Sequence, residues 1–509
     1  MRLTAKNITI RQGSFELRDI SFSLNDKENL VITGASGSGK TTLAKALAGQ
    51  LFFTGDLSFD YSHSTDLLPK VAYVEQRYTI KNRSNTIDGY YQQRYNTAYS
   101  EDSYTVSEEL KFVSDDEKRI DFLLNELSIA YLKNIPLLQL SSGEHKKFQL
   151  IKSLLNPVQL MILDEPFTGL DEAGREKLNK ILNEISCKGT KLIIIPGTHH
   201  SFPECITHVL ELARGEQKGF ALNSPLRGRS PKGLSQKVFA RHCEGDSPKQ
   251  SINKMDCFAS LAMTKLYKQF NDSFPPNGWN FENAVLMKNV TVKYGDKTVL
   301  DLINWQVKKG ERWLVKGRNG AGKSTLMSLI FADNPQAYSN EIYLFDKRRG
   351  SGESIWEIKK NIGFVSPELF AFFDKSITCF DTVASGYFDT MGVYKKLSAV
   401  QIQCIQNWLK ALDLDELAQK SLANVSSGAQ RLFLLIRALI KNPPLLIFDE
   451  PCQGLDEFQT EFIINLTDEI CRQTDTTLIY ISHYENEAPR CISHVLELKE
   501  GKAVFEEKS

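Results

Sequence analysis

Two sets of residues that could bind and hydrolyse a nucleoside triphosphate occur in this chain of 509 residues, one in each half. The first set reads GASGSGKT at 34–41, LSSGE at 140–144 and LMILDEP at 160–166, and the second reads GRNGAGKS at 317–324, VSSGA at 425–429 and LLIFDEP at 445–451. Lys323 lies 283 residues after Lys40, and Asp449 lies 285 residues after Asp164. Three motifs repeated in one order at nearly one spacing indicate a duplicated nucleotide-hydrolysing domain.

The glycine-rich loops supply the chemistry for binding phosphate. Glycines let the backbone wrap tightly, so that successive N–H groups point at phosphate oxygens, and the helix that begins there adds its positive end. The lysine supplies charge for the β- and γ-phosphates, and the next residue, Thr41 or Ser324, offers a hydroxyl to Mg²⁺. The predicted ATP-binding residues are therefore Gly34, Gly37, Gly39, Lys40, Thr41 and Thr42 in the first copy, and Gly317, Gly320, Gly322, Lys323, Ser324 and Thr325 in the second.

An acidic pair follows an apolar run in each copy. Asp164 and Asp449 end these runs and are placed to hold Mg²⁺, directly or through water. Glu165 and Glu450 come next and are the candidates for the general base that activates the attacking water.

Composition excludes several other classes of protein. The length suits two domains, and 41% apolar with 24% charged residues is ordinary for a globular protein. A formal net charge of zero gives no reason to expect nucleic acid as a partner. The nine cysteines contain no CxxC pair, which argues against a zinc or iron–sulfur site and fits reduced thiols in the cytosol. No signal peptide and no apolar run of ~20 residues is found, so we expect a cytoplasmic protein without a transmembrane segment.

The pattern of apolar residues predicts an α/β fold in each half. Short apolar strands at 30–33 and 313–316 lead into the glycine loops, and apolar residues at helical spacing follow. The continuously apolar runs before Asp164 and Asp449 are typical of parallel strands that are covered on both faces. We expect domains at 1–214 and 283–509. Between them, 215–282 has Pro, Gly, Ser and Arg without apolar periodicity at its start and predicts a flexible linker.

The serine–glycine segments carry a family resemblance. LSSGE and VSSGA resemble the signature motif of ATP-binding cassette (ABC) proteins, and PFTGLD and PCQGLD resemble the loop after their metal-binding strand. The resemblance implies two P-loop domains, each with a mostly parallel core sheet, an antiparallel β subdomain and a helical subdomain. It also implies a dimer of domains within one monomeric chain, with ATP between one P-loop and the other signature. The signature residues added to the ATP-binding set are Ser141, Ser142, Gly143, Ser426, Ser427 and Gly428.

Further roles come only from this resemblance. His199 and His483 match the catalytic histidine that contacts the γ-phosphate, and His200 stays open as an alternative to His199. Gln76 matches a glutamine that contacts the metal and couples to a partner, so it joins both the cofactor-binding and the metal-binding sets, and Tyr294 matches an aromatic residue that stacks on adenine.

The two copies depart from the family pattern at different places. Pro367 stands where the second glutamine is expected, which leaves Glu368 as a substitute. Gln12 occupies the place equivalent to Tyr294, which leaves Phe15 as the stacking alternative. Because both general-base glutamates are present, we expect two competent sites of unequal efficiency.

A narrower resemblance concerns the second half. Residues 337–366 and 386–394 resemble tandem bacterial cassette ATPases named for molybdate transport, although Lys347–Arg349 within the first segment also fits a solvated turn. This resemblance implies an energising subunit at the inner face of the membrane, with a separate permease as partner. The alternative is a ribosome-associated cassette translation factor. In that class the linker is a long charged helical hairpin, which NSPLRGRSPKG would break.

Overall fold

The computed structural model describes most of both predicted domains. The described ranges are 1–12, 15–35, 37–60, 70–75, 103–137, 140, 142–156, 158–170, 172–197, 202–213, 215–222, 280–294, 297–331, 333–455, 457–482 and 487–507. Those up to 222 form one compact unit, and nearly all from 280 onward form another.

The first unit is organised around one nine-stranded sheet in the order β4-β1-β2-β9-β8-β3-β7-β6-β5. Strands β8, β3, β7, β6 and β5 are parallel, whereas β1, β2 and β4 form an antiparallel part. The strands are β1 (Arg2–Gln12), β2 (Phe15–Leu24), β3 (Leu30–Thr33), β4 (Thr54–Asp60), β5 (Val71–Val74), β6 (Leu160–Asp164), β7 (Lys191–Ile195), β8 (His208–Ala213) and β9 (Glu216–Leu222).

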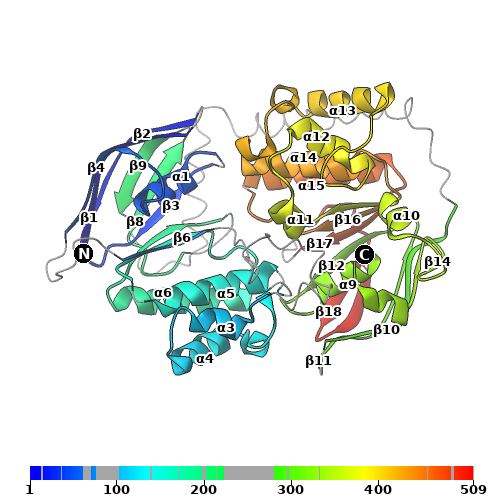
Figure 1. Ribbon diagram of the computed structural model, residues 1–509, viewed down its shortest axis with the longest axis horizontal. Coiled ribbons are helices and arrows are strands. Elements are labelled where there is room, and N and C mark those ends of the chain that lie inside the picture. Colours follow the sequence, from blue (N-terminus) through cyan, green and yellow to red (C-terminus); the bar gives the residue numbers. More distant parts are fainter. Residues whose placement is uncertain are drawn as a thin grey trace. The chain divides into compact units, whose positions relative to one another are not determined.

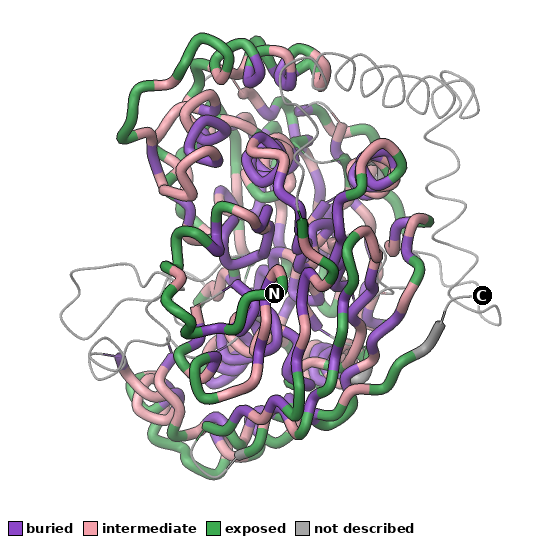
Figure 2. The backbone as a smooth tube through the Cα atoms, turned by 90° about the vertical axis from the view of Figure 1, so that its right-hand side faces the viewer, coloured by how far each residue is buried: buried purple, intermediate pink, exposed green. Residues whose placement is uncertain are grey.

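Both faces of the parallel strands are buried, as their continuous apolar sequences predicted. Successive side chains of a strand point to opposite faces. In β6, Met161 and Leu163 belong to a core shared with helices α3 to α6, and Leu160 and Ile162 belong to a second core shared with β1, β2 and α1. In Figure 2 buried residues are concentrated in the interior, whereas exposed residues lie mostly on the outer segments. The helices are α1 (Lys40–Leu47), α3 (Val106–Lys111), α4 (Glu117–Glu126), α5 (Ser142–Leu155) and α6 (Glu172–Cys187), with the 3-10 turn η2 (Ala130–Leu132).

The second unit divides its strands between two sheets. A six-stranded sheet has the order β15-β16-β17-β12-β18-β19, in which only β19 is antiparallel, and a four-stranded antiparallel sheet has the order β11-β10-β13-β14. The strands are β10 (Asn283–Tyr294), β11 (Lys297–Lys308), β12 (Arg312–Gly317), β13 (Glu341–Leu344), β14 (Lys347–Arg348), β15 (Ile362–Val365), β16 (Leu445–Asp449), β17 (Thr477–Ile481), β18 (His494–Lys499) and β19 (Lys502–Glu507).

The helices of the second unit follow the same plan as those of the first. In Figure 1, α12 lies between α13 and α14 and contacts both, and α3 and α4 lie beside α5. The helices are α9 (Lys323–Ile330), α10 (Ile355–Lys360), α11 (Pro367–Phe372), α12 (Cys379–Ala384), α13 (Ala399–Ala411), α14 (Ser427–Leu439) and α15 (Glu457–Gln473), and the 3-10 turns are η5 (Pro335–Ser339), η6 (Ser385–Tyr387), η7 (Asp415–Leu417) and η8 (Leu422–Asn424). Both units are therefore α/β, with a mostly parallel sheet and a helical subdomain, as predicted.

The structure alters two details of the prediction. Strand β9 lies inside the range expected to be linker, because it pairs with β8 from Ala213↔Glu216 to His208↔Leu222 and so extends the first unit past residue 214. Arg349 is also no part of a solvated turn. Its side chain is buried, bonds to Glu353 at 2.8 Å and lies over the ring of Tyr338.

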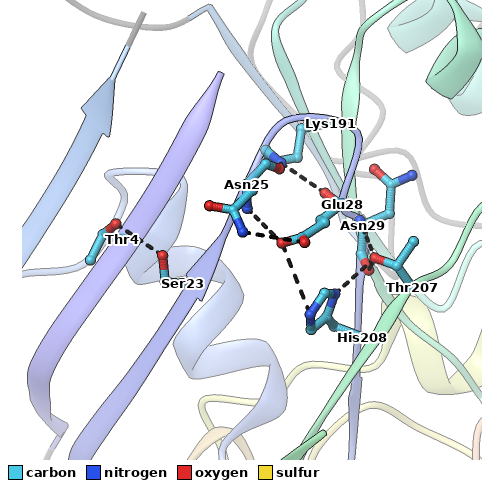
Figure 3. A network of polar contacts seen from close by, with 8 residues as sticks. All are labelled: Thr4, Ser23, Asn25, Glu28, Asn29, Lys191, Thr207 and His208. Carbon is cyan, nitrogen blue, oxygen red and sulfur yellow. Dashed lines mark hydrogen bonds and ion pairs between the residues drawn. The ribbon is translucent and has the colours of Figure 1, made fainter. Parts of the chain in front are cut away.

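A polar network closes the amino end of β3 in the first unit (Figure 3). The buried ammonium of Lys191, at the start of β7, donates to the carbonyl oxygens of Asn25 at 2.7 Å and Glu28 at 2.8 Å. The Glu28 carboxylate accepts from the backbone N–H of Asn25 at 2.6 Å. Burial lowers the pKa of Lys191 from its ordinary value of 10.5 to about 8. This network ties the loop before β3 to the neighbouring strand.

The lowered pKa of Lys191 predicts a pH dependence of stability. Since the unfolded chain holds this proton more tightly, folding carries a cost below about pH 8, and the cost fades as pH rises from about 8 to 10.5. The thermal stability of the wild-type first unit should therefore increase relative to that of Lys191→Met between pH 8 and 10, which thermal unfolding measures. A difference between wild type and Lys191→Met that stays constant over that range would contradict the assignment.

Candidate nucleotide-binding sites

Each glycine loop joins a parallel strand to a helix in the way that phosphate binding requires. The loop after β3 leads into α1 and the loop after β12 leads into α9. Gly39 and Gly322 precede these helices with φ angles of 101° and 102°, in the left-handed region that favours glycine. The helix N-termini therefore open directly onto the loops, with backbone N–H groups available to an anion.

The P-loop lysines are held within their own loops. The ammonium of Lys40 donates to the carbonyl oxygens of Gly34 at 2.6 Å and Ala35 at 2.9 Å. Lys323 makes the equivalent bonds to Gly317 at 2.7 Å and Arg318 at 3.2 Å. In both copies the ammonium therefore lies against the backbone of its own glycine loop and places a positive charge there.

Glycine at the start of each loop is required by a close backbone approach. A Cβ on Gly34 would lie 2.1 Å from the carbonyl oxygen of Leu212, and one on Gly317 would lie 2.6 Å from that of Leu498. Real Cβ atoms are not found so close to a carbonyl oxygen, and both glycines also have positive φ. The strands β8 and β18 thus pass too near for any other residue.

In the first copy two of the predicted metal ligands, Thr41 and Asp164, are in direct contact. Asp164 ends β6, and its Oδ2 accepts hydrogen bonds from the Thr41 hydroxyl at 2.9 Å and the Tyr73 hydroxyl at 3.2 Å. The carboxylate is almost wholly buried, and this burial raises its pKa, against the effect of these hydrogen bonds and of the nearby lysines. A buried carboxylate beside a hydroxyl offers hard oxygen ligands, so the residues fit Mg²⁺.

Tyr73 was not predicted from the sequence, and Phe364, at the equivalent position of the second copy, has no hydroxyl. Tyr73 pairs with Ile162 across β5 and β6, and Phe364 pairs with Ile447 across β15 and β16. Phe364 stacks on Phe331 instead, with ring centroids 4.3 Å apart. Asp449 is likewise buried at the end of β16. Phe364, on the neighbouring strand β15, has no hydroxyl to donate to it. The two carboxylates predicted to bind metal therefore have different surroundings.

Both general-base candidates have the same unusual backbone. Glu165 and Glu450 have φ angles of 49° and 45°, which a residue with a Cβ adopts rarely. Their backbone N–H groups donate to Ile195 at 2.8 Å and Ile481 at 3.0 Å, the last residues of the next strands. Such strained positions cluster at functional sites, because the surrounding structure must hold them.

The side chains of these glutamates are also held. Thr168 donates its hydroxyl to Glu165 at 3.1 Å, and Gln453 donates its amide to Glu450 at 2.8 Å. Thr168 and Gln453 belong to the PFTGLD and PCQGLD loops, so these loops position the base. The sequence carried this signal in the spacing of the motif but did not indicate the contacts.

The signature segments lie at the start of helices in both copies. Ser142 and Gly143 begin α5, and Ser427 and Gly428 begin α14. The Ser426 hydroxyl accepts the backbone N–H of Ala429 at 3.3 Å and so caps α14. A Cβ on the buried Gly428 would lie 2.0 Å from the side-chain nitrogen of Gln459, the end of a flexible side chain that can turn aside, so this contact alone does not require glycine.

The two aromatic candidates have different surroundings. A Cβ on Gly39 would lie 3.0 Å from the ring of Phe15, so this ring packs at the start of α1. The Tyr294 hydroxyl accepts a hydrogen bond from Asn334 at 2.9 Å, and the ring is partly exposed. Stacking on adenine stays a prediction for both.

At the position of the second copy where the family pattern has a glutamine, the structure has the start of a short helix. Ser366 caps the short helix α11, accepting the N–H of Leu369 at 3.0 Å, and Pro367 is its first residue. Glu368 is largely buried as the second residue of this helix. Five predicted or alternative residues lie outside the described ranges: Gln76, Ser141, His199, His200 and His483.

Comparison with known proteins identifies the family that these loops, carboxylates and signature helices define. Residues 17–168 and 300–453 both match the family described as "ABC transporter". The chain therefore belongs to this family and is an ATP-binding protein with two of its domains in tandem, and members of this family generally hydrolyse ATP.

Individual relatives extend over the whole chain. It is 34% identical to the ABC transporter ATP-binding protein ModF of Escherichia coli (strain K12), over 96% of each protein. It is 29% identical to an uncharacterized ABC transporter ATP-binding protein of Schizosaccharomyces pombe, over 98% of each. The solved archaeal ribosome recycling factor aABCE1, in complex with the stalk protein aP1, matches with a TM-score of 0.53 over 98% of this chain and 90% of that one, at 15% identity, which shows a likeness of fold alone. None of the helices in the described ranges has the length and apolar character that a bilayer-spanning segment needs.

Proposed function

We propose that the chain hydrolyses ATP at two composite sites within one monomeric chain, and that closing and reopening of this pair energises a transport system. The observation that carries the proposal is the repeated geometry of Lys40, Glu165, Lys323 and Glu450, with both glutamates in the same strained conformation. In the proposed pairing, each P-loop lysine faces the signature of the other cassette: Ser426, Ser427 and Gly428 for Lys40, and Ser141, Ser142 and Gly143 for Lys323.

The residues divide the reaction between them. The loop N–H groups and the lysine bind the phosphates and orient the terminal one. Bound Mg²⁺, held by Thr41 and Asp164 or by Ser324 and Asp449, with Gln76 added in the first copy, supplies charge stabilisation. Glu165 or Glu450 takes the proton of a water whose oxygen bonds to the γ-phosphorus, while the bond to the β-phosphate oxygen breaks and ADP and phosphate form. His199 and His483 are proposed to orient this water.

The two sites are proposed to turn over at different rates. The buried Asp164 accepts a hydrogen bond from Tyr73, whereas the equivalent Phe364 has no hydroxyl. The segment after β15 is the helix α11, which begins at Pro367 where glutamine was expected. Both differences concern the metal ligands, and such surroundings commonly change activity by about 10–100-fold.

The transport role rests on similarity to a relative named as the ATP-binding protein of an ABC transporter. We propose a cytoplasmic subunit that acts at the inner face of the membrane, with a separate permease of the molybdate type as its partner. The resemblance of 337–366 and 386–394 to the molybdate-associated cassette ATPases supports this choice of cargo.

Sedimentation from a lysate of the native host tests the transport role. A Glu165→Gln/Glu450→Gln variant should bind ATP without hydrolysing it and should stay with its partner. With ATP and Mg²⁺ it should be recovered with membranes and with a polytopic membrane protein. That complex, rebuilt in vesicles with the wild-type chain, should take up molybdate but not sulfate when ATP is added. Lys40→Ala/Lys323→Ala is the matched control, which should not be retained.

Other outcomes would redirect the proposal. Recovery with ribosomes would overturn it in favour of a translation factor. Protein that remains at the top of the gradient would reject a membrane partner, and uptake of sulfate alone would reject the molybdate assignment.

A further inference from the structure

One buried lysine near the first site has no role in the motifs described above. Lys146 lies on α5, in the turn after the signature, and its ammonium is wholly buried. The ammonium donates to the carbonyl oxygen of Glu75 at 2.9 Å and to that of Asp164 at 3.2 Å. Glu75 directly follows β5 and Asp164 ends β6, so a single side chain ties the signature helix to the carboxyl ends of both strands.

Stability alone is a poor explanation for a cation at this position. Removing an ammonium from water is costly, and an apolar side chain of similar volume is often as stable or more so. The burial is severe enough to lower the pKa of Lys146 to about 8, even though the charges of Asp164, Glu165 and Glu75 favour the ammonium. The hydrogen-bond acceptors of the ammonium are backbone carbonyls rather than carboxylates, so these bonds restrain the position of the main chain.

The two restrained residues immediately precede functional ones. Glu75 is followed by Gln76, which is predicted to contact the metal, and Asp164 is followed by Glu165, the candidate base. Asp164 also bonds to Thr41 through its side chain. A shift of either carbonyl would therefore move a metal ligand or the base relative to the P-loop.

In the second copy a different cation on the signature helix α14 contacts the segments that follow β16 and β15. Arg431, 285 residues after Lys146, lies on α14, and its guanidinium donates to the carbonyl oxygen of Pro451 at 3.4 Å. It also lies 4.5 Å from the ring centroid of Phe370 on α11, the helix that follows β15. In the first copy the cation on the signature helix bonds two backbone carbonyls at the ends of β5 and β6. In the second copy it contacts one carbonyl and one aromatic ring, in the segments that follow β16 and β15.

We propose that Lys146 is a positioning residue for ATP hydrolysis at the first site, and that it holds the backbone of Glu75, and that of Asp164 directly before Glu165, in register with the signature helix. This inference rests on the proposed hydrolysis at that site. Arg431 has the corresponding role in the second copy.

The test isolates the first site in a Glu450→Gln background. Lys146→Met should lower kcat by roughly 10–100-fold and raise the Mg²⁺ concentration needed for half-maximal rate, because positioning is lost. The Kd for ATP should change less than about twofold, since the P-loop is untouched. Lys146→Arg should restore part of the turnover. The matched control is Lys152→Met on the same helix, which removes an ion pair with Glu109 and should leave kcat, Mg²⁺ dependence and Kd unchanged.

Each other outcome overturns the inference or the function beneath it. Unchanged kcat in Lys146→Met, or parallel losses of ATP binding and thermal stability, would reject a positioning role. If Lys146→Met unfolds, Lys146→Gln keeps an N–H donor for one carbonyl and is judged by the same split between kcat and Kd. If the parent Glu450→Gln chain already lacks turnover, hydrolysis at the first site fails independently of Lys146.

Discussion

Replacing both Glu165 and Glu450 by glutamine is expected to slow ATP hydrolysis by about 10²–10⁴-fold, the usual contribution of a general base. Glutamine keeps the size and a hydrogen-bonding side chain, so that the bonds from Thr168 and Gln453 retain an acceptor. ATP affinity should stay within about threefold of wild type, because neither glutamate belongs to the loops that bind phosphate. Phosphate release at saturating ATP and equilibrium binding of ATP provide the two measurements.

The single variants and a matched pair of controls make this prediction specific. Glu165→Gln and Glu450→Gln alone should leave unequal residual rates, since only the first site has the Tyr73 hydroxyl on its aspartate. Glu176→Gln and Glu461→Gln alter exposed carboxylates at equivalent places on α6 and α15, and both should turn over like wild type. Wild-type turnover in the Glu165→Gln/Glu450→Gln protein would remove both glutamates from the role of base.

Loss of both P-loop lysines is expected to remove nucleotide binding itself. In Lys40→Ala/Lys323→Ala the ammonium inside each loop disappears, together with its charge-assisted bonds to phosphate. Such bonds contribute about 1.5–3 kcal/mol each, so affinity should fall by at least roughly tenfold to 100-fold per site. Titration with ATP, followed by fluorescence or calorimetry, measures the loss directly.

Exposed lysines provide the control for this change of charge. Lys180→Ala/Lys410→Ala also removes two positive charges, but from α6 and α13 rather than from the glycine loops. This variant should bind ATP and the Mg²⁺ complex of ATP with wild-type affinity. Unchanged affinity in Lys40→Ala/Lys323→Ala would reject the P-loop assignment for both copies.

The sequence by itself determined the fold class and predicted the main residues of the candidate sites. Strand, glycine loop and helix are local in the chain, so the spacing of apolar residues and glycines predicts them before any tertiary contact forms. The apolar run before Asp164 predicted a strand covered on both faces, and β6 is such a strand. The repeat of these motifs predicted two similar units.

Only the tertiary structure decided which other side chains complete the sites. Tyr73 lies 91 residues from Asp164 in sequence, and Lys146 lies 71 residues from Glu75. These contacts exist because neighbouring parallel strands bring their carboxyl ends to one edge of the sheet, in a register that no local pattern encodes. The strained backbone of Glu165 has the same origin: the bond of its N–H to Ile195 and that of its side chain to Thr168 hold a conformation that the isolated segment would not keep.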